Sequence, residues 1–274
     1  MVEGEGHPAE PGLYGWRPGH SAGGQWQLVD WCDPHDGRLL VADSWRVVDG
    51  RVRGVDRHRA RFLRAVENQR PNAVADADQF VTAVIDALPR TGDYFPRVEL
   101  RGRGDDWQLW YRLRPTPETS ADVVVATAPH DVRTQPLVKG PDLDALQSLR
   151  IAVQPLGADE AVIVDEQGHI VEGAYSGLLW WRDGVLVRPD DSMPRIASVT
   201  VDLVLAAARA EAVPLAEERA RPTDLAGCEV WVLSALHGLR VATNWVDAPG
   251  LAPARRAAHG RAWLEAAATP LAQG

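Results

Sequence analysis

Residues 158–181 read ADEAVIVDEQGHIVEGAYSGLLWW, and this stretch does most to decide the fold. Its apolar runs are short and are separated by polar turns, which predicts strands over 161–164, 170–172 and 177–181. The turn DEQG between the first two runs predicts a hairpin. The stretch therefore places a carboxylate, Glu172, on a short strand that directly follows a hairpin.

Outside this stretch, helical and strand-like segments follow one another irregularly and do not alternate as strand, helix and strand. We expect helices over 56–69, 75–88, 198–212 and 254–267, a short helix that starts at Pro141 and Asp142, and strands over 98–101, 107–113, 123–126 and 230–233. This mixture indicates an α+β fold with two subdomains.

A change in composition separates the two expected subdomains. The run RPTPETS at 114–120 is rich in proline and hydroxyl residues, which is typical of a linker. We therefore expect a small α/β subdomain at 25–114, a linker at 115–121 and a larger subdomain at 122–274. Residues 1–24 are rich in Gly, Pro and His, and we expect them to form a loosely ordered N-terminal arm.

The composition excludes several classes of function. Of 274 residues, 29 are Lys or Arg and 38 are Asp or Glu, and the net charge of −9 disfavours nucleic acid or an anionic membrane as partner. The acidic N-terminus lacks the apolar core of a signal peptide, and no run reaches the roughly eighteen apolar residues of a spanning helix. Two cysteines make no disulfide framework, so we expect a cytoplasmic protein. Cys32 and His35 have no second pair at zinc spacing, so we expect no metal site.

Lys139 is the single lysine of the chain, and all other basic residues that are not histidine are arginines. Arginine replaces lysine wherever a fixed positive charge suffices. It cannot replace a lysine that must form a neutral amine, because guanidinium does not deprotonate in proteins. Lys139 is therefore a candidate nucleophilic or Schiff-base amine, with a chance surface lysine as the alternative interpretation.

Three further segments carry groups that complement this amine. Arg61, on the first expected helix, can direct a guanidinium fork at a phosphate. The run IASVT at 196–200 opens a helix, whose free backbone N–H groups and dipole make an anion site. Glu172 supplies a carboxylate. These are the groups that pyridoxal phosphate needs, because the amine binds its aldehyde and the carboxylate keeps its pyridine nitrogen protonated.

Taken together, these segments resemble the fold type IV pyridoxal-phosphate enzymes, the class IV aminotransferase family, over about residues 40–245. DGRV at 49–52 with HRARF at 58–62 is similar to the opening motif of the family. The stretch from 158 to 180 is similar to its central motif, and SVT at 198–200 to its phosphate-binding motif.

The resemblance implies a fold like that of D-amino-acid aminotransferase, with pyridoxal 5′-phosphate in the cleft between the subdomains, and a homodimer. It also implies roles for individual residues. They are Lys139 as the Schiff-base lysine, Glu172 as the partner of the pyridine nitrogen, and Arg61, Ser198, Val199 and Thr200 as contacts of the cofactor phosphate.

Residues 231–240, WVLSALHGLR, look more like the loop of aminodeoxychorismate lyases than the Thr-rich loop of transaminases. This implies release of pyruvate from an amino-acid-like substrate to leave an aromatic amine, with Ser234 and Leu236 as cofactor contacts in the loop. Three positions depart from the motifs: Ser234 stands where the lyases carry Asn, Gly177 replaces an Asn, and Ser198 replaces a Gly.

Two other functions stay open on the sequence. A transaminase of a small or branched-chain amino acid would use the same proton removal at Cα, and no residue of the sequence separates it from a lyase. A relative that has lost the cofactor would act as a binding protein, although the retained lysine argues against it. Arg101, Arg133 and Arg240 are candidates for binding a substrate carboxylate, with structural ion pairs as the alternative.

Overall fold

The computed structural model describes residues 8–18, 24–29 and 37–272. The chain folds into two compact units: unit 1 comprises Met1–Glu118, Val138–Pro141 and Ala268–Gly274, and unit 2 comprises Thr119–Leu137 and Asp142–Ala267. The first crossing between the units falls inside the linker expected at 115–121. The segment that contains Lys139 and the C-terminal residues belong to unit 1, which the sequence did not indicate.

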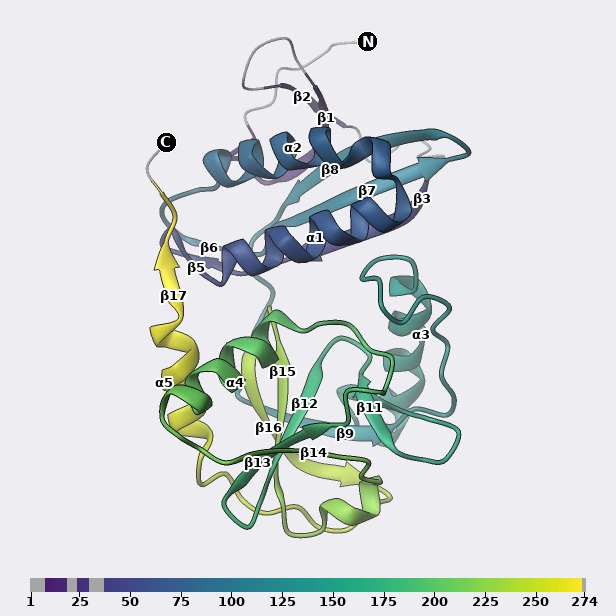
Figure 1. Ribbon diagram of the computed structural model, residues 1–274, viewed down its shortest axis with the longest axis vertical. Coiled ribbons are helices and arrows are strands. Elements are labelled where there is room, and N and C mark those ends of the chain that lie inside the picture. The colour runs from purple at the N-terminus through teal and green to yellow at the C-terminus, as the bar shows by residue number, and fades with distance from the viewer. Residues whose placement is uncertain (1–7, 19–23, 30–36, 273–274) are drawn as a thin grey trace. The chain divides into compact units, whose positions relative to one another are not determined.

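Unit 1 is built on an antiparallel five-stranded sheet. Its strands are β1 (Gly12–Arg17), β2 (Gln25–Leu28), β3 (Arg38–Ser44), β7 (Arg97–Arg103) and β8 (Asp106–Leu113). They lie in the order β2–β1–β8–β7–β3, so β3 is an edge strand. Helices α1 (Val55–Gln69) and α2 (Val74–Ala87) cover one face of this sheet (Figure 1). Phe62, Phe80 and Leu100 belong to the apolar core between the helices and the sheet.

A smaller sheet completes unit 1. Its strands are β4 (Val47–Val48), β5 (Arg51–Arg53), β6 (Asp93–Tyr94) and β17 (Ala268–Pro270), in the order β17–β5–β4–β6. A short 3-10 helix, Pro71–Ala73, joins α1 to α2. The C-terminal strand β17 thus pairs with a hairpin of the N-terminal half of the chain.

Residues 12–17 are a strand, so the loose arm expected over residues 1–24 is wrong for this segment. β1 pairs with β8, and the rings of Tyr14 and Tyr111 stack with their centroids 6.0 Å apart. The ring of Trp16 packs on that of Phe80, with the centroids 5.7 Å apart. Burial of two aromatic side chains outweighs the Gly-rich and Pro-rich composition, which had predicted disorder.

A buried charge cluster joins α1 to β3. The carboxylate of Asp43 is fully buried, lies 2.8 Å from His58 Nδ1 and accepts a hydrogen bond from Arg61 Nε at 2.7 Å. Burial alone raises the pKa of Asp43, but the charges and hydrogen bonds of Arg61 and His58 outweigh it and hold that pKa well below its usual range. Asp43 therefore stays ionised and fixes the first turns of α1 on the sheet.

Lys139 lies beside the edge strand β3. Its carbonyl oxygen accepts a hydrogen bond from the backbone N–H of Ala42 at 2.7 Å. The next residue, Gly140, has φ of 140°, and a Cβ there would lie 2.7 Å from Ala42 N and 2.9 Å from Val41 Cα. Only glycine tolerates this φ and this contact, so the backbone next to Lys139 depends on Gly140.

Unit 2 contains a mixed eight-stranded sheet. Its strands are β9 (Asp122–Thr127), β10 (Glu160–Val164), β11 (Ile170–Gly173), β12 (Gly177–Arg182), β13 (Val185–Pro189), β14 (Leu215–Glu218), β15 (Glu229–Ser234) and β16 (Gly238–Val246). The order is β11–β10–β9–β16–β15–β12–β13–β14. The three strands predicted within 158–181 are β10, β11 and β12, and β10 and β11 pair as the predicted hairpin.

Helices pack against this sheet through two apolar clusters. Helices α4 (Val199–Ala210) and α5 (Ala257–Ala266) share a cluster with Trp231, and α3 (Leu143–Val153) shares another with Ile163. Two short 3-10 helices are Gln154–Leu156 and Pro222–Leu225. The four long helices predicted from the sequence are present with ends that differ by a few residues, and the mixed architecture confirms the α+β class. No helix within the described ranges has the length and apolar character to cross a membrane.

The helix expected to start at Pro141 begins at Leu143 instead, with Asp142 at the N-cap position. The carboxylate of Asp142 does not cap this helix. It accepts hydrogen bonds from Thr134 N at 3.0 Å, Thr134 Oγ1 at 2.7 Å and Gln135 N at 2.9 Å. Asp142 therefore fastens the loop that precedes Lys139 in the sequence to the start of α3.

We expect Asp43→Asn to lower the free energy of unfolding by about 3 kcal/mol or more near neutral pH, because Arg61 loses its buried counter-charge. Since the pKa of Asp43 is lower in the folded chain than in the unfolded chain, this stability is present above about pH 4 and is lost as the pH falls further. Urea unfolding at several pH values measures both effects. Asp78→Asn is the matched control, because Asp78 is half-exposed where it pairs with Arg59, and it should cost at most about 1 kcal/mol. An equal decrease in the free energy of unfolding of Asp43→Asn and Asp78→Asn would contradict the role of Asp43 as the buried counter-charge of Arg61.

We expect Gly140→Ala to destabilise the chain by about 2–4 kcal/mol, because the added Cβ meets backbone atoms of β3 at a φ that alanine avoids. Gly157→Ala is the control. Gly157 also has a positive φ, 78°, but a Cβ there would have nothing within 4 Å. Denaturant unfolding of both variants separates the contact from the backbone strain, and a loss for Gly140→Ala no larger than that for Gly157→Ala would refute the close approach.

Candidate active site

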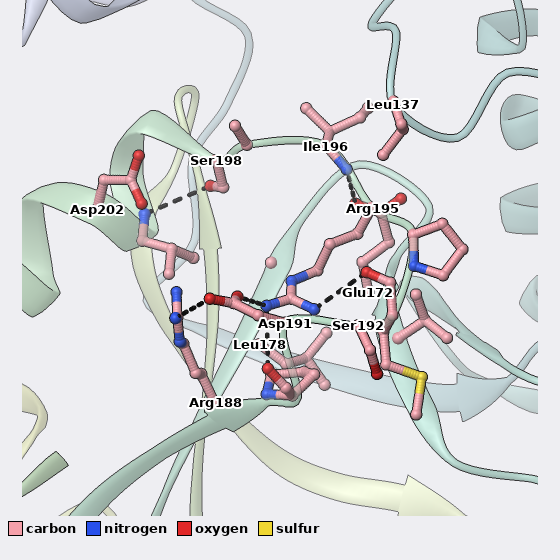
Figure 2. Close-up of a pocket in the computed structure, with 17 residues that line it drawn as sticks. Leu137, Glu172, Leu178, Arg188, Asp191, Ser192, Arg195, Ile196, Ser198 and Asp202 are labelled. Carbon is pink, nitrogen blue, oxygen red and sulfur yellow. Dashed lines mark hydrogen bonds and ion pairs between the residues drawn. The ribbon is translucent and has the colours of Figure 1, made fainter. Parts of the chain in front are cut away.

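Unit 2 contains a pocket of about 400 Å³ beside the N-terminus of α4 (Figure 2). Strands β11 and β12 contribute Glu172 and Leu178, and α4 contributes Val201 and Asp202. The loop of residues 190–198 between β13 and α4 forms much of the remaining wall. A pocket of this size accommodates a small cofactor.

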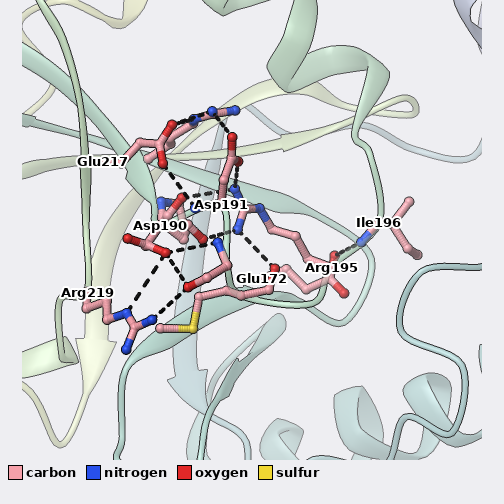
Figure 3. Close-up of polar contacts among 11 residues, drawn as sticks. Glu172, Asp190, Asp191, Arg195, Ile196, Glu217 and Arg219 are labelled. Carbon is pink, nitrogen blue, oxygen red and sulfur yellow. Dashed lines mark hydrogen bonds and ion pairs between the residues drawn. The ribbon is translucent and has the colours of Figure 1, made fainter.

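Glu172 is one of three carboxylates that line this pocket, with Asp191 and Asp202, and its side chain is only 8% exposed. Its Oε1 accepts a hydrogen bond from Arg133 Nη1 at 2.6 Å. Its Oε2 accepts a hydrogen bond from the backbone N–H of Ile196 at 3.3 Å (Figure 3). Burial of a carboxylate is costly unless donors replace the lost water, and these two hydrogen bonds supply such donors to Glu172.

Arg133 also binds a second carboxylate. Its Nε donates to Asp131 Oδ1 at 2.9 Å and its Nη2 to Asp131 Oδ2 at 2.7 Å, a bidentate pair. Burial opposes the charge of Asp131, but hydrogen bonds from Arg133 outweigh it and lower the pKa of Asp131. In the same way, Asp131 and Glu172 raise the pKa of Arg133 against its burial. Two carboxylates and one guanidinium leave this cluster with a net negative charge.

A network of ion pairs shapes the loop that carries Ile196 (Figure 3). Arg195 Nη1 donates to the carbonyl oxygen of Asp190 at 2.6 Å, and its Nη2 donates to Asp191 Oδ1 at 2.8 Å. Arg188 on β13 pairs with Asp191 and with Glu217 Oε1, the latter at 2.5 Å. The arginines on this wall are therefore engaged with the loop itself, and they hold the backbone that presents Ile196 N to Glu172.

The N-terminus of α4 lies at the same pocket. Ser198 is the N-cap, and its Oγ accepts a hydrogen bond from Val201 N at 3.3 Å. The first N–H groups of a helix have no partner within the helix and attract anions. Val199 and Thr200 are buried, and the residues of this helix start that line the pocket are Ser198, Val201 and Asp202. Gly177 on β12 is in close contact here, since a Cβ would lie 2.6 Å from Val201 Cγ2, which explains a glycine where the family motif has Asn.

Two of the predicted site residues, Lys139 and Arg61, belong to unit 1. The Arg61 guanidinium binds Asp43 through Nε and through Nη2, the latter at 2.7 Å to Oδ1. Burial lowers the pKa of His58, the charge of Asp43 opposes this, and the charges of Arg61 and Lys139 lower it further. The charges of Lys139 and Arg61 thus both lower the pKa of His58. The prediction that Arg61 contacts a phosphate stays a prediction.

The other predicted contacts do not line the pocket. Ser234 and Leu236 lie where β15 turns into β16, and Ser234 Oγ accepts a hydrogen bond from His237 N at 3.2 Å. Arg240 is 4% exposed and pairs with buried Glu160 at 3.4 Å, which makes it structural. Arg101 binds Glu99 at 2.7 Å and stacks on Trp110. The expectation that Arg133 binds a substrate carboxylate gives way to its pairing with Glu172.

Sequence reasoning missed the partners of Glu172. Arg133 lies 39 positions away from Glu172, and Ile196 acts through its backbone, so no local pattern marks either contact. Among the described residues, no group of three or more His, Cys, Asp or Glu could hold a metal ion, and Cys32 and His35 lie outside the described residues.

Comparison with known proteins identifies the chain. The family "Amino-transferase class IV" matches residues 40–245. A curated protein of Methanocaldococcus jannaschii, which bears the name branched-chain-amino-acid aminotransferase as a provisional assignment, is 32% identical over 105 residues. That alignment covers 38% of this chain and 35% of the relative, so it spans about a third of the curated protein.

Solved structures share the fold. A fold IV transaminase from Curtobacterium pusillum has a TM-score of 0.73 at 19% identity, with 93% of this chain and 97% of that chain covered. A hypothetical aminotransferase from Mycobacterium tuberculosis in its PLP-bound form has a TM-score of 0.72 at 16% identity, covering 93% and 98%. A branched-chain aminotransferase from Thermoproteus uzoniensis, solved with norvaline, has a TM-score of 0.73 at 16% identity, covering 85% and 90%. With three quarters of its length matched by the family, the chain belongs to the class IV aminotransferases.

Proposed function

We propose that this chain is a pyridoxal-5′-phosphate-dependent transaminase that moves the amino group of a small or branched-chain amino acid to a 2-oxo acid. The observation that carries the proposal is the pocket of unit 2, which is lined both by an ionisable carboxylate, Glu172, and by the N-terminus of α4. A pyridine nitrogen and a phosphate group require these two features. The Mycobacterium tuberculosis neighbour was solved with PLP, which supports the choice of cofactor.

The residues present fit this cofactor. The net negative cluster of Glu172, Arg133 and Asp131 suits a protonated pyridine nitrogen, and the backbone N–H groups of Val199 and Thr200 suit a phosphate. By the family resemblance, Arg61 would bind the phosphate and Lys139 the aldehyde. The bound cofactor supplies an electron sink that stabilises negative charge at the substrate Cα.

Lys139 is the residue that would move the proton at Cα. Proton transfer requires a group that can exist as a neutral amine near neutral pH, and a guanidinium cannot do so. The chain retains one lysine among its many arginines, which supports a chemical role for this position. Glu172 would hold the proton of the pyridine nitrogen and so keep the ring electron-withdrawing.

The second candidate is the lyase suggested by residues 231–240, which would release pyruvate and leave an aromatic amine. Its support is the tight β15–β16 turn, which carries the sequence SALHG at 234–238. Against it, Ser234 stands in place of the lyase Asn, and its Oγ is engaged by His237 N. Transaminases among the solved neighbours support the first candidate. A homodimer belongs to the proposal on the strength of the family resemblance, and a cytoplasmic location on the strength of the low cysteine count.

The two reactions differ in what happens without an acceptor. We expect the cofactor-loaded enzyme to convert once to the pyridoxamine form when it receives an L- or D-amino acid from a panel of small and branched-chain donors. Addition of 2-oxoglutarate or pyruvate should restore the aldehyde spectrum, because transamination is two half-reactions. Absorbance spectroscopy follows both steps, and Glu172→Gln should lower the rate more than about tenfold, or roughly 1.4 kcal/mol in barrier.

Other outcomes separate the alternatives. Sustained pyruvate release from aminodeoxychorismate with no added 2-oxo acid would favour the lyase over the transaminase. A protein that takes up no pyridoxal phosphate would refute both enzymes and leave the cofactor-free relative.

A further inference from the structure

We propose that Arg133 is the positioning residue for Glu172: with Asp131 as its counter-charge, it holds the Glu172 carboxylate ionised and oriented to pair with a cationic ring nitrogen. This inference rests on the proposed function, because it assigns a role toward the same cofactor. It concerns a residue for which the sequence suggested binding of a substrate carboxylate, with a structural ion pair as the alternative.

All three nitrogens of the Arg133 guanidinium donate hydrogen bonds. Nη1 donates to Glu172 Oε1 at 2.6 Å and to the carbonyl oxygen of Pro194 at 2.9 Å, while Nε and Nη2 bind Asp131. Its side chain is 3% exposed. Because the guanidinium is planar and its donors have fixed directions, two anchors on one fork determine where the third partner must lie. Arg133 therefore sets the orientation of Glu172.

The loop that carries Arg133 is itself anchored. Asp131 also accepts a hydrogen bond from the backbone N–H of Arg133 at 3.0 Å. The next two residues, Thr134 and Gln135, donate backbone hydrogen bonds to the carboxylate of Asp142 at the start of α3. These contacts fix the backbone on both sides of the guanidinium, so Arg133 acts as a rigid support and not as a mobile surface arginine.

Charge balance explains why a guanidinium can support a site for a cation. Alone, Arg133 would neutralise Glu172 and repel a protonated pyridine nitrogen. Asp131 offsets the charge of Arg133, so the cluster keeps the negative charge of one carboxylate for the ligand. Asp131 is 36% exposed, which lets solvent stabilise the outer end of the cluster while Glu172 stays buried.

The two arginines that line the pocket are paired with carboxylates other than Glu172. Besides Glu172, the charged residues that line it are Arg188, Asp191, Arg195 and Asp202. Arg188 and Arg195 pair with Asp191, and Arg188 also pairs with Glu217. Strand β12 contributes the uncharged side chain of Leu178 to the pocket. The loop of residues 190–198 contributes the backbone N–H of Ile196, which donates to Glu172. The ion pairs of Arg188 and Arg195 are therefore with other carboxylates, whereas Arg133 donates to Glu172.

The test compares Arg133→Met, which removes the charge, with Arg133→Lys, which keeps it without the fork. In the cofactor-free protein, difference infrared spectroscopy against matched Glu172→Gln partners isolates the carboxyl band of residue 172. We expect Glu172 to be ionised in the wild type near neutral pH. In Arg133→Met its protonation midpoint should rise by about 1–3 pH units, since an opposite charge beside a carboxyl lowers its pKa by that amount. The protonation midpoint of Glu172 in Arg133→Lys should lie between the midpoints in the wild type and in Arg133→Met.

The cofactor-loaded enzyme supplies a second readout. In Arg133→Met the acid limb of the pH profile of kcat should move to higher pH, and pyridoxal-phosphate affinity should fall at least tenfold, with partial rescue in Arg133→Lys. Asp131→Asn should weaken cofactor affinity without raising the protonation midpoint of Glu172, because the charge of Arg133 is then uncompensated. An unchanged midpoint and pH profile in Arg133→Met would overturn the proposal. If Arg133→Met fails to fold, wild-type affinity in Asp131→Asn together with wild-type behaviour of Arg133→Lys would overturn it.

These outcomes separate this inference from the proposed function. The infrared measurement needs no cofactor, so it tests the coupling of Arg133 to Glu172 even in a protein that binds none. Failure of the wild type to take up pyridoxal phosphate would refute the proposed function, whereas normal uptake with no effect of Arg133→Met would refute the positioning role alone.

Discussion

The hydrogen bond from Arg133 to buried Glu172, 2.6 Å long, is the contact on which the rest of the pocket depends. A carboxylate that is 8% exposed needs donors to remain charged, and the chain supplies them from two loops that are distant in sequence. Each loop is fixed in turn, one by Asp131 and Asp142 and the other by Arg195. Much of the ion pairing in unit 2 therefore serves to place one charge at the pocket wall.

Local patterns were sufficient for the elements that surround this charge. The apolar runs and the DEQG turn at 165–168 predicted the β10–β11 hairpin, and Ser198 marked the start of α4 as an N-cap residue does. The mixed α+β architecture also followed from periodicity. These features are decided by neighbours in sequence, which is why a single sequence reveals them.

Long-range contacts were not predictable in the same way. Residues 12–17 form a strand because Tyr14 and Trp16 pack on residues of β8 and α2. The side chain of Asp142 accepts a hydrogen bond from Thr134 and does not cap α3. Arg240 looked available for a substrate, but it lies in a buried pair with Glu160. The sequence marked Glu172 and Lys139 as chemical groups through type and family motif, while the partners that tune Glu172 depend on tertiary packing.

We propose that the single lysine, Lys139, carries the cofactor, and chemical trapping tests this most directly. Pyridoxal phosphate bound to the wild-type protein would be reduced with borohydride, and peptides would be mapped by mass spectrometry. Because Lys139 is the one lysine, the N-terminal amine is the built-in control for nonspecific labelling. We expect a phosphopyridoxyl group on Lys139. A protein that carries no label, or that carries it at the N-terminus alone, would contradict it.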